Sequence, residues 1–186
     1  RRQRQMCIRD RLEAVDDALG RMDKVQERLD MLKLEVVPER RDMELGRFLK
    51  DLCGQLEKKL KVIDIALDCR IAIPLVSDPK LLARIMENLL LNALEAGGEG
   101  TQVRINAYHN DPQGQAVIEV TDSGPGISQH ILPDALFEPY KTTKPGGSGI
   151  GLTIARHFTW AMGGSLAVHS DGVGKGSTFT FRLPRG

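Results

Sequence analysis

The stretch DPKLLARIMENLLLNALEAGG, residues 78–98, does most to set the fold of this chain. Asp78 is a favoured N-cap residue, and Pro79 suits the first position of a helix. Gly97 and Gly98 favour a helix stop at the other end. Between them the apolar residues recur every three or four positions, at Leu81, Leu82, Ile85, Leu89, Ala93 and Ala96. This spacing predicts an amphipathic helix from Pro79 to Ala96 with one buried face.

Polar side chains interrupt the apolar run of this helix. Asn88, Asn92 and Glu95 stand at i, i+4 and i+7 and so share one helix face, and Glu87 lies beside them. Asparagine is a mediocre helix former and is costly in a core unless it is hydrogen-bonded. The face is therefore either merely solvated, which is the commoner case, or its side-chain oxygens coordinate a hard cation and ordered water.

Helix and strand patterns surround this segment on both sides. Leucines at helical spacing predict a helix over residues 45–60, and a glycine pair closes another predicted helix over residues 150–162. Strands are predicted at residues 62–67, 70–76, 103–108, 116–121, 165–170 and 178–183. The simplest packing of this order puts the helices on one face of a mixed, largely antiparallel sheet, which is an α/β (α+β) two-layer sandwich.

A narrow apolar stripe precedes the globular part. It consists of Leu12, Val15, Leu19, Met22, Val25, Leu29 and Leu32. Charged residues fill the positions between, so the stripe predicts a long helix that packs against a partner, as in a coiled coil or a two-helix hairpin. Pro38 and the charged residues after it favour a break. We therefore expect an N-terminal helix within residues 1–37, a linker over 38–43 and a globular domain over 44–186.

The composition excludes several classes of protein. Lys+Arg 26 against Asp+Glu 25 leave a net charge of +1, which gives no electrostatic basis for a nucleic-acid partner. Cys7, Cys53 and Cys69 are odd in number and lack metal-ligand spacing, so we expect reduced thiols and a cytoplasmic location. No apolar run approaches the roughly 18 residues of a membrane helix, so we expect membrane attachment only through segments upstream of this sequence.

The sequence Asp122-Ser123-Gly124-Pro125-Gly126-Ile127 follows the predicted strand over residues 116–121. An aspartate and two glycines at a strand end often form no more than a turn. Alternatively, a partly buried, ionised aspartate accepts a hydrogen bond from an exocyclic amine, and the glycines let a flat base approach the backbone. Adenine carries such an amine, so this second interpretation predicts a purine site.

A second glycine-rich stretch, Gly146–Leu152, runs into the last predicted helix. Backbone N–H groups at such a helix start form a concave site that favours phosphate oxygens. No Lys-Ser or Lys-Thr pair follows as in a P-loop, and Leu152 stands where a dinucleotide fingerprint needs a third glycine. Lys141 and Lys144 would add charge there, although loop lysines are more often merely solvated. Gly174–Phe179 alone predicts only a hairpin turn.

Taken in order, these motifs resemble the catalytic domain of sensor histidine kinases, in the superfamily that also holds DNA gyrase and Hsp90-type chaperones. The resemblance covers about residues 44–184. Its N box, first glycine box, F box, second glycine box and terminal glycine turn stand at Glu87–Ala93, Asp122–Ile127, Leu136–Tyr140, Gly147–Leu152 and Gly174–Phe179. The F box and the Thr142-Thr143-Lys144 that follows it favour kinases over the gyrase, chaperone and repair branches.

This resemblance implies a sandwich of the Bergerat type that binds ATP and Mg²⁺. It implies that Asp122 holds the adenine amine and that Asn92 ligates the magnesium ion. Asn88 and Glu87 would act near the γ-phosphate as catalytic residues, beneath a lid over about residues 128–148. The implied nucleotide-binding residues are Asn88, Asn92, Asp122, Gly124, Gly126, Ile127, Lys141, Thr143, Lys144, Gly147, Ser148, Gly149, Ile150, Gly151, Leu152 and Thr178.

The resemblance also implies a protein-histidine kinase, which passes phosphate from ATP to a histidine on a dimerisation hairpin and then to a response regulator. Residues 1–37 resemble the second helix of that hairpin, through which such kinases form homodimers. The H box of the first helix is absent, because none of His109, His130, His157 and His169 is followed by Glu and Pro. We therefore expect a chain that binds ATP but does not serve as its own phosphoacceptor.

Three other functions compete with this one. An ATPase clamp of the gyrase or chaperone class needs further domains after the ATP fold, whereas this sequence ends at Gly186, just past the last predicted strand. An anti-sigma-type serine kinase shares the motifs but does not normally carry a long helix in front. A degenerate module without ATP is disfavoured because every glycine and polar residue that the site needs is present. Glu95 departs from kinases that carry a basic residue on this face.

Overall fold

The structure, a computed structural model, describes residues 36–60, 64–69, 72–98, 100–110, 114–129, 135–141 and 149–185. The apolar stripe at residues 12–32, and with it the predicted N-terminal helix, lies outside the described residues. The helices are α2 (Leu45–Leu60), α3 (Pro79–Gly97) and α4 (Gly151–Ala161), with a short 3-10 helix, η2 (Ala135–Phe137). The strands are β1 (Arg41–Glu44), β2 (Asp64–Asp68), β3 (Pro74–Ser77), β4 (Gln102–Asn110), β5 (Gln115–Asp122), β6 (Ser165–His169) and β7 (Ser177–Pro184).

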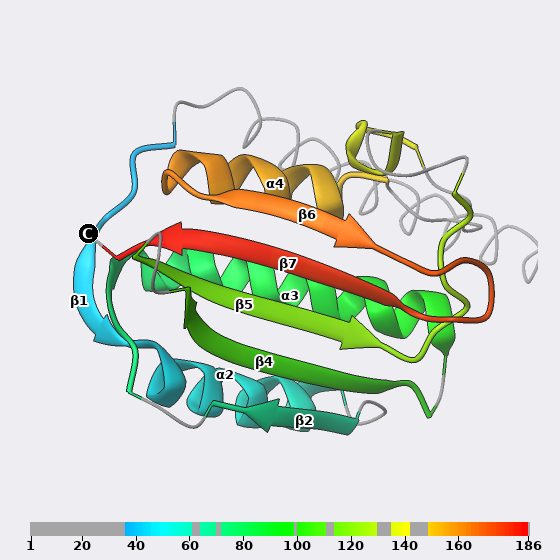
Figure 1. The fold of residues 1–186 in the computed structure, drawn as a ribbon, viewed down its shortest axis with the longest axis horizontal. Helices are drawn as coiled ribbons and strands as arrows, with labels where there is room; N and C mark the ends of the chain where they lie inside the picture. Colours follow the sequence, from blue (N-terminus) through cyan, green and yellow to red (C-terminus); the bar gives the residue numbers. More distant parts are fainter. Residues whose placement is uncertain are drawn as a thin grey trace, which may run out of the picture. The chain divides into compact units, whose positions relative to one another are not determined.

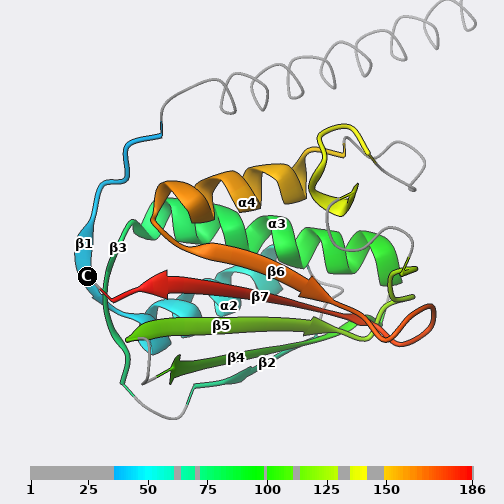
Figure 2. The same ribbon diagram turned by 45° about the horizontal axis from the view of Figure 1, so that its top comes forward.

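A five-stranded sheet in the order β2-β4-β5-β7-β6 forms the centre of the fold. β2 runs parallel to β4, and every other neighbouring pair is antiparallel. Helices α3 and α4 pack against each other and cover one face of this sheet, with α2 beside them along β2 (Figures 1 and 2). The predicted two-layer sandwich with a mixed, largely antiparallel sheet is therefore confirmed.

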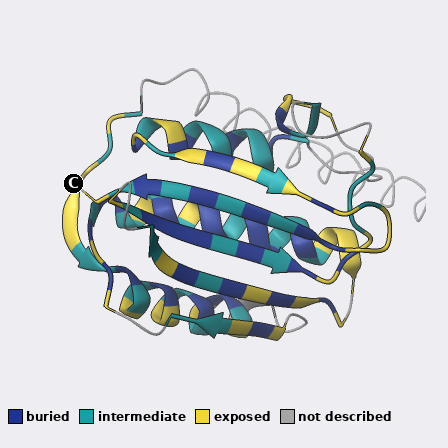
Figure 3. Cartoon of the chain, in the orientation of Figure 1, coloured by how far each residue is buried: buried dark blue, intermediate teal, exposed yellow. Residues whose placement is uncertain are grey.

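The core lies between the sheet and the helices. Strand β7 alternates between buried and less buried residues along its length, and β5 does so from Ile118 to Asp122, as Figure 3 shows. Ile118 and Phe181 pair directly across these strands and are both fully buried. Burial of side chains of this size contributes about 1.5–3 kcal/mol each, so this face holds the helices in place. The period-two pattern of the sheet thus decides which side chains of β5 face α3.

A second sheet of two strands, β1 and β3, lies at one end of the fold. β1 pairs antiparallel with β3, with Arg41 opposite Ser77 and Glu44 opposite Pro74. The prediction of a linker over residues 38–43 is therefore wrong from Arg41 onwards. Arg41 and Asp42 remain exposed in this ribbon, so their charges stay solvated while their backbone is paired. A charged sequence is compatible with such a strand because only the backbone makes the ladder.

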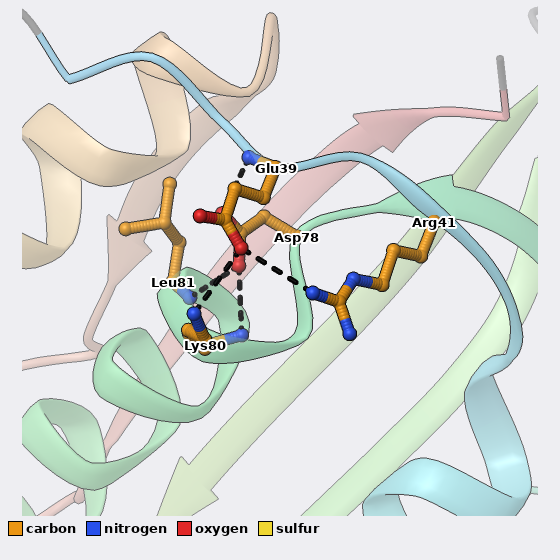
Figure 4. Close-up of polar contacts among 5 residues, drawn as sticks. All are labelled: Glu39, Arg41, Asp78, Lys80 and Leu81. Carbon is orange, nitrogen blue, oxygen red and sulfur yellow. Dashed lines mark hydrogen bonds and ion pairs between the residues drawn. The ribbon is translucent and has the colours of Figure 1, made fainter.

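Asp78 holds the start of α3 and the entering chain together. Its Oδ1 atom accepts hydrogen bonds from the backbone N–H groups of Lys80 (2.8 Å) and Leu81 (3.2 Å), as predicted for an N-cap. Its Oδ2 atom accepts a further bond from the N–H of Glu39 at 2.8 Å. The Glu39 carboxylate in turn contacts the side chains of Lys80 and Arg41 at the surface (Figure 4). The segment before β1 is thereby fastened to α3.

Glu44 makes the matching connection at the start of α2. Its carboxylate accepts hydrogen bonds from the N–H groups of Gly46 (2.8 Å) and Arg47 (2.7 Å), in the first turn of α2. It also accepts one from Ile73, just before β3, at 3.1 Å. Burial by itself raises the pKa of Glu44, but these three backbone hydrogen bonds and the charge of Arg47 together outweigh it and lower the pKa below the ordinary value. Asp78, at the start of α3, thus also binds the backbone just before β1, and Glu44, at the start of α2, binds the backbone just before β3.

The described cysteines, Cys53 and Cys69, are free thiols. Burial raises the pKa of Cys53 to about 11, which keeps it protonated. Over the described ranges, the structure contains no helix with the length and apolar character that membrane spanning requires.

Candidate functional site

Asp122 is the last residue of β5 and its side chain is buried, with 7% of the residue exposed. Its Oδ1 atom accepts a hydrogen bond from the N–H of Gly124 at 2.8 Å. Its Oδ2 atom accepts one from the hydroxyl of Ser177, directly opposite on β7, at 2.5 Å. A carboxylate offers about four acceptor positions, so the protein occupies only part of its capacity.

Two glycine turns that are far apart in sequence interlock beside Asp122. The N–H of Gly174 donates to the carbonyl of Pro125 at 2.6 Å, and the N–H of Gly176 donates to the carbonyl of Gly124 at 3.1 Å. These bonds join the first glycine box to the terminal glycine turn. In Figure 1 both turns lie at the right end of the sheet, after β5 and between β6 and β7.

The two turns lie so close together that only glycine fits at positions 126 and 176. Both have left-handed backbone angles, with φ of 71° and 68°. A Cβ atom at Gly126 would collide with the carbonyl oxygen of Gly172, and one at Gly176 would collide with the carbonyl oxygen of Asp122. A residue with a side chain would therefore be strained at either position and would also push the turns apart.

The predicted polar face of α3 meets the start of α4. Glu87, Asn88 and Asn92 are half-buried, whereas Glu95 is exposed. A Cβ atom at Gly151, the first residue of α4, would lie 3.4 Å from Oδ1 of Asn88. The N box and the second glycine box, which are far apart in sequence, therefore lie close to each other. At the C-terminal end of α3, a Cβ atom at Gly97 would come within 3.3 Å of the Cα of Gly124.

The start of α4 provides backbone donors without a side-chain cap. Ile150 occupies the N-cap position and is fully buried, and no side-chain hydrogen bond caps the helix there. The first N–H groups of a helix have no intrahelical partner and favour an anion. Since the Ile150 side chain packs in the core, any contact that this residue makes with a ligand must come from its backbone. Gly151 and Leu152 are half-buried beside it.

The F box is fastened to the same helix. Phe137 is buried, and its carbonyl accepts hydrogen bonds from the Thr153 hydroxyl (3.0 Å) and the Arg156 guanidinium (3.3 Å). Arg156 also lies 4.8 Å from the centre of the Phe137 ring, within the range of a cation–π contact. The N–H of Tyr140 donates to the carbonyl of Gly149 at 3.0 Å. The F box is thus held at Phe137 by α4 and at Tyr140 by the backbone of Gly149.

The structure brings together only some of the other residues predicted for the site. Lys141 is exposed and forms an ion pair with Glu138 at 2.6 Å, so its charge is partly engaged at the surface. Gly124, Gly126 and Ile127 lie in the interlocked turns. The remaining predicted residues, Thr143, Lys144, Gly147 and Ser148, lie outside the described residues.

Thr178, which is among the predicted nucleotide-binding residues, does not lie beside the Asp122 carboxylate. Its side chain lies on the opposite face of the sheet, where its hydroxyl is 3.0 Å from that of Thr121. Ser177 occupies the position on the Asp122 side because successive residues of a strand point to opposite faces. The sequence carried a signal for this residue. Phe179 is plainly a core residue, and counting back by two from it places Ser177 on the buried face.

Comparison with known proteins gives the family. Residues 77–186 match the family described as "Histidine kinase-, DNA gyrase B-, and HSP90-like ATPase", which is more than half of the chain. The chain belongs to this ATPase family. The five motifs and the two-layer sandwich around Asp122 are thus those of an ATP-binding domain of the family.

Relatives within this ATPase family are sensor kinases. Sensor histidine kinase ZraS of Escherichia coli (strain K12) is 43% identical over 109 residues, which are 58% of this chain and 22% of ZraS. The chain spans less than a quarter of the length of the curated relatives it matches first. Full-length ShkA in complex with AMPPNP has a TM-score of 0.75 at 25% identity, covering 92% of this chain and 36% of ShkA. Histidine kinase ThkA in complex with the response regulator TrrA has a TM-score of 0.76 at 23% identity, covering 92% and 49%, and shows the shared fold.

Proposed function

We propose that this chain contains the ATP-binding catalytic domain of a sensor histidine kinase, which transfers the γ-phosphate of ATP to a histidine on a dimerisation hairpin. The observation that carries the proposal is the buried Asp122 carboxylate, held by Gly124 and Ser177 where two glycine turns interlock. The identity to ZraS supports the kinase branch of the family over the gyrase and chaperone branches.

In this proposal Asp122 recognises the base. Its carboxylate accepts a hydrogen bond from the exocyclic amine of adenine through an acceptor position that Gly124 and Ser177 leave open. Gly124, Gly126 and Ile127 let the base lie against the backbone of the turn. Guanine carries a carbonyl oxygen at the same ring position, and that oxygen would face the carboxylate as a second acceptor. The site would therefore select adenine.

The polar face of α3 and the start of α4 bind the phosphates in this proposal. Asn92 ligates Mg²⁺, and Asn88 and Glu87 position groups near the γ-phosphate as the catalytic residues. The residues present fit the ion, because side-chain oxygens are hard ligands and Mg²⁺ in such sites completes its shell with water and phosphate oxygens. Bound Mg²⁺ would neutralise charge that develops on the phosphates during transfer. The proposed phosphate contacts are Lys141, Thr143, Lys144, Gly147, Ser148, Gly149, Ile150, Gly151 and Leu152.

The partners follow from the kinase assignment. Residues 1–37 would form part of the hairpin through which the protein dimerises, and the phosphate would pass on to the receiver domain of a response regulator. The complex of the neighbour ThkA with TrrA supports that type of partner. The hairpin histidine must come from sequence outside this chain, because no H box is present here. We place the reaction in the cytoplasm.

Phosphotransfer in trans tests the proposal. The chain is mixed with a separate hairpin that carries an H box and with γ-labelled ATP and Mg²⁺, and acid-labile label on the hairpin is measured. Label is expected with the unchanged chain and is expected to fall to background for Asn92→Ala and Asp122→Ala. The matched controls are Asn110→Ala, at the end of β4 away from Asp122, and Asp51→Ala, which is exposed on α2. Hydrolysis of ATP without label on the hairpin would contradict the kinase assignment.

A further inference from the structure

Ser170 links the two glycine turns through a single buried hydroxyl. It follows β6 directly, and 4% of the residue is exposed. The hydroxyl accepts hydrogen bonds from the N–H groups of Ile127 (3.0 Å) and Gly172 (3.3 Å). It donates to the carbonyl of Gly176 at 2.7 Å. One donor and two acceptor positions are all that a hydroxyl offers, so Ser170 uses its full capacity inside this joint.

The bond to Gly176 places Ser170 one step from the Asp122 carboxylate. Gly176 has both of its backbone groups fixed, with its N–H on the carbonyl of Gly124 and its C=O on the Ser170 hydroxyl. The orientation of this peptide sets the direction of the next residue, Ser177, whose hydroxyl binds Oδ2 of Asp122. Ser170 therefore acts on Asp122 through Gly176 and Ser177.

The bond to Ile127 fixes the other side of the same pocket. Ile127 ends the first glycine box, and its N–H has the Ser170 hydroxyl as its partner in a half-buried environment. Without that partner the N–H would lose its bond and the turn would be free to move away from the Asp122 carboxylate. The Ser170 side chain thus binds the first glycine box at Ile127 and the terminal glycine turn at Gly176.

We propose that Ser170 is a positioning residue that sets the selectivity for the purine amine, a role that rests on the proposed function of Asp122. It makes no contact with the nucleotide itself. It keeps the first glycine box and the Ser177 hydroxyl in register, so that the Asp122 carboxylate stands at one fixed distance from the base. Removal of the hydroxyl loosens this register and weakens the bond that depends on it, the one to the exocyclic amine.

Selectivity between two nucleotides separates positioning from folding. Calorimetry measures the Kd of ATP and of purine riboside triphosphate, which lacks the 6-amine, for the unchanged chain, Ser170→Ala and Ser170→Cys. The thiol of the cysteine variant keeps the volume of the side chain but is a weak hydrogen-bonding group. Both variants are expected to raise the Kd of ATP about tenfold, the loss typical of one hydrogen bond, and to change the Kd of the analogue by less than about twofold. Ser77→Ala, which removes another buried serine hydroxyl, on β3, is the matched control and keeps both values.

The outcomes divide cleanly. If the Kd of ATP and the Kd of the analogue rise by the same factor in both variants, or if neither Kd changes, Ser170 does not set the selectivity. The proposed function would still stand in that case. An unchanged chain that binds neither nucleotide would overturn the proposed function and this role with it. Hydrogen exchange provides a measurement that needs no nucleotide. The Ile127 and Gly172 amides are expected to exchange at least about tenfold faster in Ser170→Ala. Equal rates would show that the Ser170 hydroxyl does not hold these two turns together.

Discussion

Asp78 and Asp122 are the two buried carboxylates within the described residues, and they are bound in different ways. Asp78 accepts three backbone N–H bonds, two from the first turn of α3 and one from Glu39. Asp122 accepts one backbone N–H bond and one bond from a rotatable hydroxyl. In Figure 1 the β1 ribbon lies at the left end of the sheet, and the turns beside Asp122 lie at the right.

The difference indicates how a structural aspartate can be distinguished from one whose carboxylate can still bind a ligand. Three backbone donors fill most of the acceptor positions of Asp78, and two of them belong to the start of α3, which presents such unpaired N–H groups as every helix start does. The chain around Asp122 supplies fewer donors, and glycines there keep the space beside the carboxylate clear of side chains. Burial is similar at the two positions, so the number and type of fixed donors carries the distinction.

The largest effect is expected from the backbone that encloses Asp122. Gly176→Ala would place a Cβ atom against the carbonyl oxygen of Asp122 at a left-handed φ, and we expect a loss of about 3 kcal/mol or more in the free energy of unfolding. Gly174→Ala has a similar φ but open space, so only the backbone strain of about 1 kcal/mol remains. Urea unfolding of the two variants measures the difference, and equal losses would show that the turns are not tightly interlocked.

At the other end of the sheet, substitution of Asp78 should affect stability and leave nucleotide binding alone. Asp78→Ala removes the cap of α3 and the bond to Glu39, for a loss of about 2 kcal/mol. Asp78→Ser keeps a capping oxygen but cannot also reach Glu39, so about half of that loss is expected. The nucleotide Kd of the folded protein should stay within about twofold, because Asn88 lies about 15 Å further along α3. A large change in the nucleotide Kd of either variant would contradict the claim that Asp78 is purely structural.

A smaller effect distinguishes the two neighbours Ser177 and Thr178. Ser177→Ala removes one of the two bonds that fix Asp122, and we expect about a tenfold rise in the Kd of ATP. Thr178→Ala removes a contact with Thr121 on the far side of the sheet and should leave the Kd unchanged. Fluorescence titration of the pair checks the register, and the opposite ranking would restore the residue predicted from sequence.

The smallest effect concerns Glu44, the last residue of β1, which lies opposite Pro74 in the two-stranded sheet. Because backbone hydrogen bonds and the charge of Arg47 together outweigh its burial and lower its pKa in the folded state, Glu44 adds stability above its ordinary pKa of 4.5. That contribution is lost as the pH falls through the lower, folded-state pKa. Unfolding at pH 7 and at pH 3 should therefore show Glu44→Gln less stable than the unchanged chain at pH 7, with a smaller difference at pH 3. A difference that does not depend on pH would contradict this.

The comparison also separates what the sequence could and could not predict. The Asp78-Pro79 helix start and the Asp122 turn rest on neighbouring residues, and local signals were sufficient for both. The bond from Glu39 to Asp78 spans 39 residues and the bond from Ser177 to Asp122 spans 55, so both depend on how separate strands align. Strand β1 was missed for the same reason, since its charged residues carry no apolar pattern and its partner β3 is distant in sequence. The candidate site was predicted from its motifs, but the hydrogen bonds within it depend on the strand register, which the motifs do not give.

Recognition of the adenine amine by Asp122 is the central claim, and a cycle of four Kd values tests it most directly. ATP and purine riboside triphosphate are titrated against the unchanged chain and against Asp122→Ala. The unchanged chain should lose at least about tenfold in affinity when the amine is absent, and Asp122→Ala should bind the two nucleotides equally. If the amine is worth the same factor in both proteins, another group recognises it and the account fails.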